Sequence, residues 1–275
     1  MIQYKDYVFA ESLDQAYELN QKKNNIILAG NGWRKMSDRQ YGTAIDLSRL
    51  GLDQIEETEE AYIIGCMVTL RQIETHSGLN GFTDGAVKES VRHIVGTQFR
   101  NCVTVGGSIF GRYGFSDVLT VFLAMDSYVE LYKGGVISLA EFAQMKYDND
   151  ILVHLIVKKT PLKMAYTSFR NQSTDFPVLT CAVGLSDGNV KTVIGARPVR
   201  AGVVGDPEEL LKEILGADGS LDKDATENTE AVKQYAAWAA DQFTYGDNLR
   251  AGAAYRKHLA AVLVKRNIMK VGELS

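Results

Sequence analysis

The sequence predicts an α+β protein built from two domains, and three observations support this expectation. Short apolar strands alternate with short helices up to residue 157. All four prolines then lie between positions 161 and 207, and such a change in composition is typical of a domain boundary. Beyond the boundary, a group of predicted strands precedes a group of amphipathic helices. We therefore expect one domain over residues 1–160 and a smaller α+β domain over residues 161–275.

The first domain opens with a helix and a strand. Ser12 is the predicted N-cap of a helix that continues to about residue 22. Residues 26–29 form a short buried strand, which stops at Gly30-Asn31-Gly32-Trp33. A strand end with bare amides suits a phosphate group or a ring, and Trp33 could pack on a ligand or fill the core. Further strands are expected at 44–47, 61–66, 128–132 and 151–157, and helices at 70–76, from 85 onward and at 139–142.

Residues 100–117 are the most informative stretch of the chain. The β-branched run 103–105 predicts a strand that ends at the paired glycines Gly106 and Gly107. Paired glycines leave backbone N–H groups uncovered, so a large ligand can lie against the main chain and phosphate oxygens can bind. The alternative is a hairpin or bulge in which the glycines only supply unusual dihedral angles. The residues after Ser116 are apolar on nearly every side, which predicts a buried helix with Asp117 in its first turn.

The second domain is predicted to be a three-stranded sheet that helices cover on one face. Its strands are expected at residues 163–170, 177–185 and 190–196, with a turn at 186–189 between the last two. Its helices are expected at residues 207–215, 225–243 and 249–267, where apolar residues recur at helical spacing.

The composition excludes several classes of function. The net charge is −4 and no Lys/Arg cluster is present, which argues against a nucleic-acid binder. No apolar run is long enough to span a membrane, and the first residues do not resemble a signal peptide. Cys66, Cys102 and Cys181 are odd in number and far apart, so we expect buried free thiols in a reducing cytoplasm and neither a disulfide nor a metal site.

No motif for acid–base or nucleophilic catalysis stands out. The chain lacks a Gly-x-Gly-x-x-Gly turn, a Walker A lysine, a Gly-x-Ser-x-Gly elbow and a His-Glu-x-x-His pair. Asp117 could be a general base, but capping and hydrogen bonding to a ligand fit its position better. We therefore assign no catalytic and no metal-binding residue, and a bound redox cofactor would carry the chemistry.

Several segments together resemble a known family. Residues 104–109, followed by Ser116-Asp117, are similar to the second flavin motif of the molybdenum hydroxylases, in particular of their FAD-binding medium subunit in xanthine dehydrogenase and carbon monoxide dehydrogenase. Residues 29–33 fall where that family has its first flavin loop. Further matches follow in the same order at 151–152, 169–170, 175–177, 194–200, 255–259 and 262–266. The resemblance covers essentially the whole chain.

The resemblance implies a fold and a cofactor. The fold is a two-lobed FAD-binding domain (PCMH-like), with lobes of about 1–52 and 53–160, followed by a small C-terminal domain of the CO dehydrogenase flavoprotein type. Asp117 would bind the adenosine portion of FAD, Ile94 would lie near the adenine, and Leu152 and Arg170 would line the flavin cleft. The implied cofactor-binding residues are Leu28, Ala29, Gly30, Asn31, Gly32, Trp33, Arg34, Ile94, Val103, Thr104, Val105, Gly106, Gly107, Ser108, Ile109, Ser116, Asp117, Leu152 and Arg170.

The resemblance also implies partners. A large subunit would hold molybdopterin, a small subunit would hold two [2Fe–2S] clusters, and electrons would pass through FAD to NAD or another acceptor. The partners are expected to dock near Arg112 and Tyr113 and on the outer faces of the C-terminal helices. Residues 32–33 and 110–114 depart from the family pattern. These departures keep open the alternative of a structural subunit without flavin. A self-sufficient flavin oxidoreductase is a second alternative, but it should offer a substrate-facing acid or base or a covalent flavin anchor, and none stands at a convincing spacing.

Overall fold

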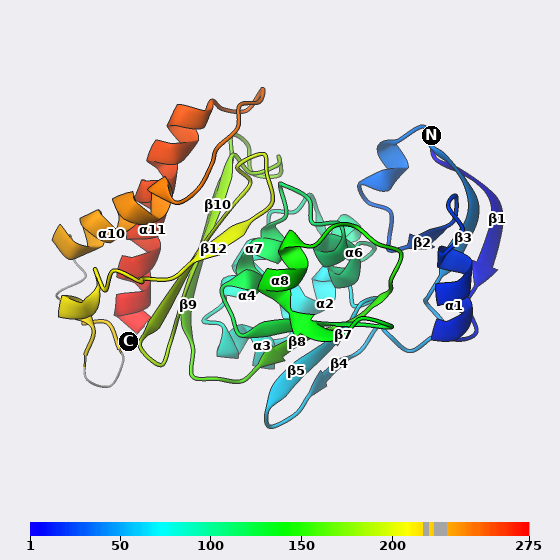
Figure 1. The fold of residues 1–275 in the computed structure, drawn as a ribbon, viewed down its shortest axis with the longest axis horizontal. Helices are drawn as coiled ribbons and strands as arrows, with labels where there is room; N and C mark the ends of the chain where they lie inside the picture. The colour runs from blue at the N-terminus through cyan, green and yellow to red at the C-terminus, as the bar shows by residue number, and fades with distance from the viewer. Residues whose placement is uncertain (217–219, 223–229, 275) are drawn as a thin grey trace.

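The computed structural model describes residues 1–216, 220–222 and 230–274, and Figure 1 shows their arrangement. Three sheets succeed one another along the molecule. A small N-terminal lobe lies at one end, a larger sheet with several helices occupies the middle, and a third sheet with two long helices forms the other end. None of the helices in these residues combines the length and the apolar character needed to cross a membrane.

The N-terminal lobe is a parallel sheet against which one helix packs. Its elements are β1 (Gln3–Phe9), α1 (Leu13–Asn20), β2 (Ile26–Leu28), the 3-10 helix η1 (Arg34–Met36) and β3 (Gln40–Asp46). Ser12 caps α1 as predicted, because its Oγ accepts a hydrogen bond from the Gln15 N–H at 3.1 Å. The sequence does not predict β1, because most residues of this edge strand are exposed and no apolar period marks it.

The central sheet is antiparallel and its strand order is β4-β5-β8-β6-β7. Its strands are β4 (Ile55–Glu57), β5 (Ala61–Gly65), β6 (Ser127–Leu131), β7 (Gly135–Ser138) and β8 (Leu152–Lys158). The helices of this part are α2 (Leu70–Thr75), α3 (Ser77–Phe82), α4 (Ala86–Val91), α5 (Thr97–Arg100), α6 (Val105–Phe110), α7 (Asp117–Leu123) and α8 (Leu139–Gln144). Every residue of α7 is buried, which confirms the predicted internal helix.

The C-terminal sheet is antiparallel with the order β12-β11-β10-β9. Its strands are β9 (Lys163–Phe169), β10 (Leu179–Ser186), β11 (Asn189–Gly195) and the short β12 (Gly202–Val204). Helix α11 (Ala253–Leu274) packs on one face, and α10 (Glu230–Asp241) packs on α11. Helices α4 and α7 pack on the opposite face. The prediction of three strands therefore misses β12. The helices of this domain cover one face as predicted, and the sequence does not predict that α4 and α7 of the preceding residues cover the other.

The helix predicted at 207–215 is reduced to the 3-10 turn η2 (Lys212–Ile214). The carboxylate of Asp206 accepts hydrogen bonds from the N–H groups of Leu210 and Leu211, which favours a local turn over a continuous helix. Of the helix predicted at 225–243, residues 225–229 lie outside the described residues, and α10 accounts for most of the remainder.

Two apolar cores result from this arrangement. The first joins the N-terminal lobe and the central part to Met164, Ala182 and Val193 on the inner face of the C-terminal sheet. The second lies between that sheet and helices α10 and α11. Cys66 and Cys181 are buried free thiols as predicted, but Cys102 is exposed, so the prediction that it is buried is wrong.

Candidate functional site

The loop after β2 carries a row of unused hydrogen-bond donors. Gly30 and Asn31 both have a positive φ, of 69° and 52°. The N–H groups of the four consecutive residues 30–33 donate no hydrogen bond to any other group in the described part of the chain. Successive free N–H groups in a turn make a concave site for an anion. The first loop therefore has the bare amides that the sequence predicts.

Close packing, as well as the positive φ, requires glycine at position 30. A Cβ atom there would lie 2.0 Å from the carbonyl oxygen of Cys102, and a Cβ at Gly32 would lie 2.4 Å from Cγ1 of Val103. The first loop thus lies directly against the residues that precede α6. The two glycine segments, about 75 residues apart in the sequence, are therefore adjacent in the fold.

The second glycine segment is helical, and the predicted strand at 103–105 is wrong. Thr104 caps α6, because its Oγ1 accepts a hydrogen bond from the Gly107 N–H at 3.1 Å. Ser108 donates its hydroxyl to the Thr104 carbonyl oxygen at 2.9 Å, so its side chain is also engaged within the helix. A capping threonine between two valines resembles a β-branched strand in the sequence, and only the hydrogen bonds distinguish the two.

The amides at the start of α6 are not free. The Val105 N–H donates to the Val68 carbonyl at 2.8 Å, and the Gly106 N–H donates to the Cys66 carbonyl at 2.9 Å. The prediction that the paired glycines present bare N–H groups is therefore wrong. These glycines instead permit close packing, since a Cβ at Gly107 would lie 2.9 Å from Cβ of Ala29.

Asp117 lies inside the protein at the first turn of α7. Its Oδ1 accepts hydrogen bonds from the Tyr166 hydroxyl and from Nη2 of Arg170, both at 2.5 Å. Burial raises the pKa of the carboxyl group, and the positive charge of Arg170 partly opposes that shift. The preceding residue, Ser116, caps the helix by accepting a hydrogen bond from the Leu119 N–H at 3.0 Å. Asp117 thus connects α7 to the C-terminal sheet.

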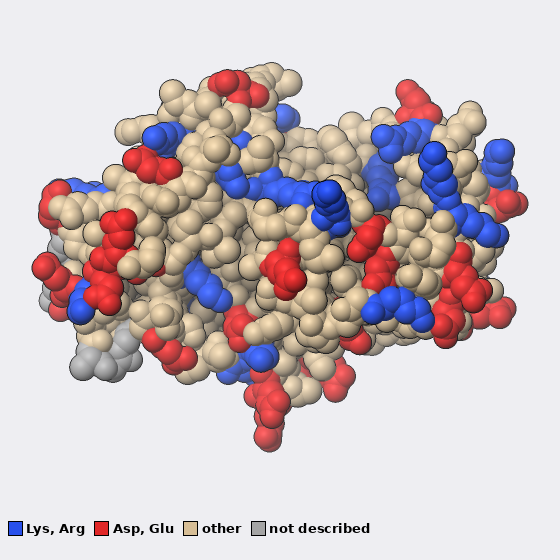
Figure 2. All heavy atoms as spheres, in the orientation of Figure 1, with Lys and Arg blue, Asp and Glu red and all other residues tan. Residues whose placement is uncertain are grey.

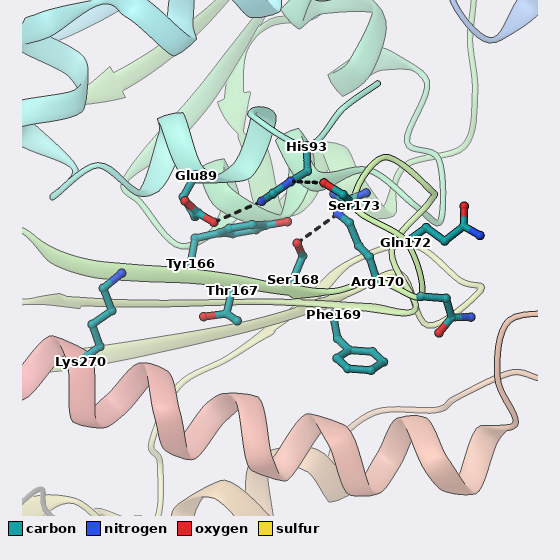
Figure 3. A pocket seen from close by; sticks show the side chains of 11 residues that line it. Glu89, His93, Tyr166, Thr167, Ser168, Phe169, Arg170, Gln172, Ser173 and Lys270 are labelled. Atoms are coloured by element: carbon teal, nitrogen blue, oxygen red, sulfur yellow. Dashed lines mark hydrogen bonds and ion pairs between the residues drawn. The ribbon is translucent and has the colours of Figure 1, made fainter. Parts of the chain in front are cut away.

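A pocket of about 570 Å³ opens beside Arg170, between α4, β9 and the residues that follow β9 (Figure 3). All but one of the residues that line it carry a polar group, and they include Glu89, His93, Tyr166, Arg170, Ser173 and Lys270. In Figure 3, His93 lies between Glu89 and Ser173, at 3.8 Å and 3.3 Å respectively. Burial and the charge of Arg92 lower the pKa of His93, which favours the neutral ring.

The predicted residues contribute unequally to this pocket. Arg170 is the one predicted site residue among those that line it. Ile94 is half-buried next to His93, whereas Val105, Ile109 and Leu152 are buried in the core. Sequence reasoning missed His93, because a lone histidine carries no spacing signal, although it directly precedes Ile94.

Trp33 belongs to an aromatic cluster that the sequence does not predict. Its ring centre lies 4.9 Å from that of Phe115, 5.4 Å from that of Phe176 and 6.2 Å from that of Tyr113. These rings come from the first loop, the α6–α7 connection and the segment after β9. Trp33 is neither a core plug nor fully free, because 44% of its surface is exposed.

Arg112 does not lie on an exposed rim, so its predicted role as a docking residue is wrong. It is 2% exposed, and its guanidinium lies 4.3 Å from the ring centres of both Phe142 and Tyr147. It donates hydrogen bonds to the carbonyl oxygens of Phe142 and Met145. Stacking between the two rings stabilises the charge of Arg112, which forms no ion pair with a carboxylate of the described residues.

These features fit FAD. The free amides of residues 30–33 are suitable donors for a diphosphate, and Arg34 follows them directly with a positive charge. Lys and Arg side chains also gather at the end of the N-terminal lobe where the chain begins (Figure 2). The segment 171–176 links the loop to the pocket, because Ser173 lines the pocket and Phe176 contacts Trp33. A dinucleotide could extend from the loop toward the pocket.

Comparison with known proteins identifies the family. Residues 2–160 match the FAD-binding domain of molybdopterin dehydrogenases. The uncharacterized protein YgfM of Escherichia coli K12 is 26% identical over 259 residues, which are 92% of this chain and 91% of that protein. The nicotine 6-hydroxylase medium subunit of Paenarthrobacter nicotinovorans is 24% identical over 247 residues, which are 85% of this chain and 83% of that one.

Solved structures show the same fold. A chain of the Cu,Mo-CO dehydrogenase has a TM-score of 0.83 at 19% identity, with 100% of both chains covered. A chain of quinoline 2-oxidoreductase from Pseudomonas putida 86 has a TM-score of 0.79 at 17% identity, covering 98% of this chain and 96% of that one. The predicted α+β flavoprotein fold is confirmed. Because the family match extends over more than half of its length, this chain belongs to the FAD-binding domain family of the molybdopterin dehydrogenases, and it is an oxidoreductase subunit whose cofactor is FAD.

Proposed function

We propose that this chain is the electron-transfer subunit of a multi-subunit, molybdopterin-dependent hydroxylase or dehydrogenase. In this role it would relay electrons from the [2Fe–2S] clusters of a small partner subunit to NAD or another acceptor, and a large partner subunit would hold the molybdopterin and the substrate. FAD supplies the redox chemistry when bound. The names of two similar proteins support the proposal, since one is the medium subunit of a nicotine hydroxylase and the other is a Cu,Mo-CO dehydrogenase.

The free amides of residues 30–33 are the observation that carries the proposal. They would hold the FAD diphosphate, with Arg34 adding positive charge and the start of α6 at residues 104–109 forming the floor beneath it. The polar pocket beside Arg170 would receive a ring of the cofactor, or the acceptor that approaches it. Asp117 would act mainly by fixing Arg170 at the pocket.

The first test is the identity of the cofactor. The purified protein should show the absorption spectrum of oxidised flavin, and denaturation should release FAD that chromatography identifies. Two separate anchoring regions, the amide loop and the pocket, suit a dinucleotide better than a mononucleotide. Recovery of FMN alone, or of no flavin from freshly purified protein, would contradict the proposal.

The second test concerns the partners. Isolation of the chain from its native host under mild conditions should recover a molybdopterin subunit and a [2Fe–2S] subunit, and the isolated chain should have no hydroxylase activity. A stable interface of this kind usually buries at least about 1,000 Å². A lone flavoprotein that turns over an organic substrate without partners would instead favour a self-sufficient flavin oxidoreductase.

We also propose that the protein works in the cytoplasm. The three free cysteines support a reducing compartment, because an exposed thiol such as Cys102 remains unpaired most easily there. Fractionation of the native host followed by immunodetection tests this location. Recovery of the chain in the medium or the periplasm would contradict it.

A further inference from the structure

The indole of Trp33 lies beside the free amides, and it stays half-exposed although three aromatic rings contact it. Trp33 follows Gly32 directly, and the backbone N–H of Trp33 is one of the four free donors. Six Phe, Tyr or Trp side chains of the described residues are at least 37% exposed, and Trp33 at 44% is the one that adjoins the free amides. A large ring left half in water next to an anion site is a feature of ligand pockets, where an apolar surface adjoins a few polar donors.

The position of the indole is fixed by its neighbours. Phe115 and Phe176 contact each other at 4.5 Å between ring centres, and both contact Trp33. Phe176 is itself held, because the guanidinium of Arg250 lies 5.1 Å from its ring centre and pairs with Asp175 at 2.7 Å. The contacts to Trp33 are tilted or edge-on, with interplanar angles of 58° and 88°. With these contacts in place, 44% of the surface of Trp33 remains exposed.

The diphosphate and the rings of a dinucleotide suit the free amides of residues 30–33 and the indole of Trp33. Each end of FAD is a flat heteroaromatic ring, adenine or isoalloxazine, joined through a sugar or ribityl chain to the central diphosphate. A diphosphate at the amides of residues 30–33 would bring one of these rings near the indole. Stacking needs no particular hydrogen-bonding pattern, because every such ring has a π face.

We propose that Trp33 binds one ring of the FAD by stacking, while the amides of residues 30–33 hold the diphosphate; this inference rests on the FAD-binding function proposed above. Trp33 is thus a cofactor-binding residue through its side chain as well as its backbone. Phe115 and Phe176 position the indole through their ring contacts.

The experiment compares Trp33→Ala and Trp33→Phe with the wild-type chain. FAD is removed from each full-length protein, and calorimetric titrations with FAD, ADP and FMN give three affinities. We expect Trp33→Ala to weaken FAD binding about 10-fold or more, and Trp33→Phe to weaken it less, because phenylalanine retains a stacking face. The affinity for ADP should fall in parallel if the stacked ring is adenine, and the affinity for FMN if it is isoalloxazine.

A second readout reports a ligand close to Trp33 independently of stability. The chain has two tryptophans, and Trp238 lies on α10, where its Nε1 donates to Glu208. In a Trp238→Phe variant all indole fluorescence comes from Trp33, which remains native. ADP or FMN, whichever carries the stacked ring, should change that emission at saturation. If Trp33→Ala fails to fold, this fluorescence change still tests whether a ring of FAD binds at Trp33.

Two outcomes would overturn the inference. One is full FAD affinity in a folded Trp33→Ala variant, and the other is a Trp33 emission that neither ADP nor FMN alters although FAD binds. In both cases the proposed function stands, because FAD still binds the chain. If wild-type protein binds no FAD at all, the proposed function itself fails and the inference fails with it.

Discussion

The buried carboxylate of Asp117 is one of the polar contacts that connect the two halves of this protein. Asp117 on α7 pairs with Arg170 beyond β9, and both side chains are less than a tenth exposed. We expect Asp117→Ala to lower the free energy of unfolding by about 3–5 kcal/mol, because it leaves a buried guanidinium without its partner. Urea denaturation of the FAD-free protein measures the change. The double variant Asp117→Ala/Arg170→Leu removes both charges and should recover part of the loss. A stable Asp117→Ala variant with weakened FAD binding would instead assign the carboxylate to the cofactor.

A second buried ion pair makes stability depend on pH. Glu74 is 7% exposed and accepts two hydrogen bonds from Arg100, at 2.8 and 3.1 Å. Burial opposes ionisation of Glu74, but Arg100 and Arg71 outweigh it and lower the pKa of this carboxyl group. The stabilisation that ionised Glu74 contributes to the free energy of unfolding is therefore fully present above the unfolded-state pKa of about 4.3. It is lost as the pH falls through the lower folded-state pKa.

Substitution of Glu74 should reveal this dependence. We expect Glu74→Gln to be less stable than wild type at pH 7, and the difference should shrink between about pH 5 and pH 3 as the wild-type carboxylate is protonated. Urea midpoints across this range measure it, with the exposed Glu59→Gln as the control that should track wild type. If the urea midpoints of Glu74→Gln and wild type differed by the same amount at every pH, the lowered pKa of Glu74 would be contradicted.

At the scale of elements, α7 lies against the C-terminal sheet at a distance that glycine makes possible. A Cβ at Gly184 on β10 would lie 2.3 Å from the carbonyl oxygen of Ala124, which follows α7. We expect Gly184→Ala to lower stability by about 1–3 kcal/mol, because backbone must move to admit the methyl group. Gly81→Ala in α3 is the matched control, since nothing lies within 4 Å of its Cβ position, and it should be neutral or slightly stabilising. Equal melting temperatures for the two variants would show that the space between Gly184 and the Ala124 carbonyl admits a methyl group.

The sequence predicts some elements better than others. The difference is whether an element is formed by interactions between neighbouring residues or between residues far apart in the sequence. Helix α7 and the loop at residues 30–33 follow from local signals, namely an apolar run after a capping serine and a strand that stops at glycines. The helix that begins at Val105 depends on hydrogen bonds to Val68 and Cys66, which are distant in the sequence, so its β-branched residues resemble a strand. The pocket escapes prediction for the same reason, since α4, β9 and α11 each contribute residues to it.

At the scale of the whole molecule, the C-terminal sheet is a middle layer. Its outer face packs on α11 and its inner face on α4 and α7, so that Met164, Tyr166 and Val193 complete the core of the preceding residues. The two domains that the sequence predicts, 1–160 and 161–275, thus share an apolar interface. Interfaces that complete a core couple the unfolding of the parts they join.

We therefore expect residues 1–160 not to fold stably alone, although the family match ends at residue 160. Without the sheet, the faces of α4 and α7 that pack on β9, β10 and β11 would be exposed as a large apolar patch. The full chain should unfold in one cooperative transition, with the loss of flavin and the loss of helical circular dichroism at the same urea concentration. The fragment 1–160 should bind a hydrophobic dye and retain no FAD. A fragment that unfolds cooperatively and binds FAD would show that the first domain is independent, and the pocket beside Arg170, which the fragment lacks, would then be dispensable for cofactor binding.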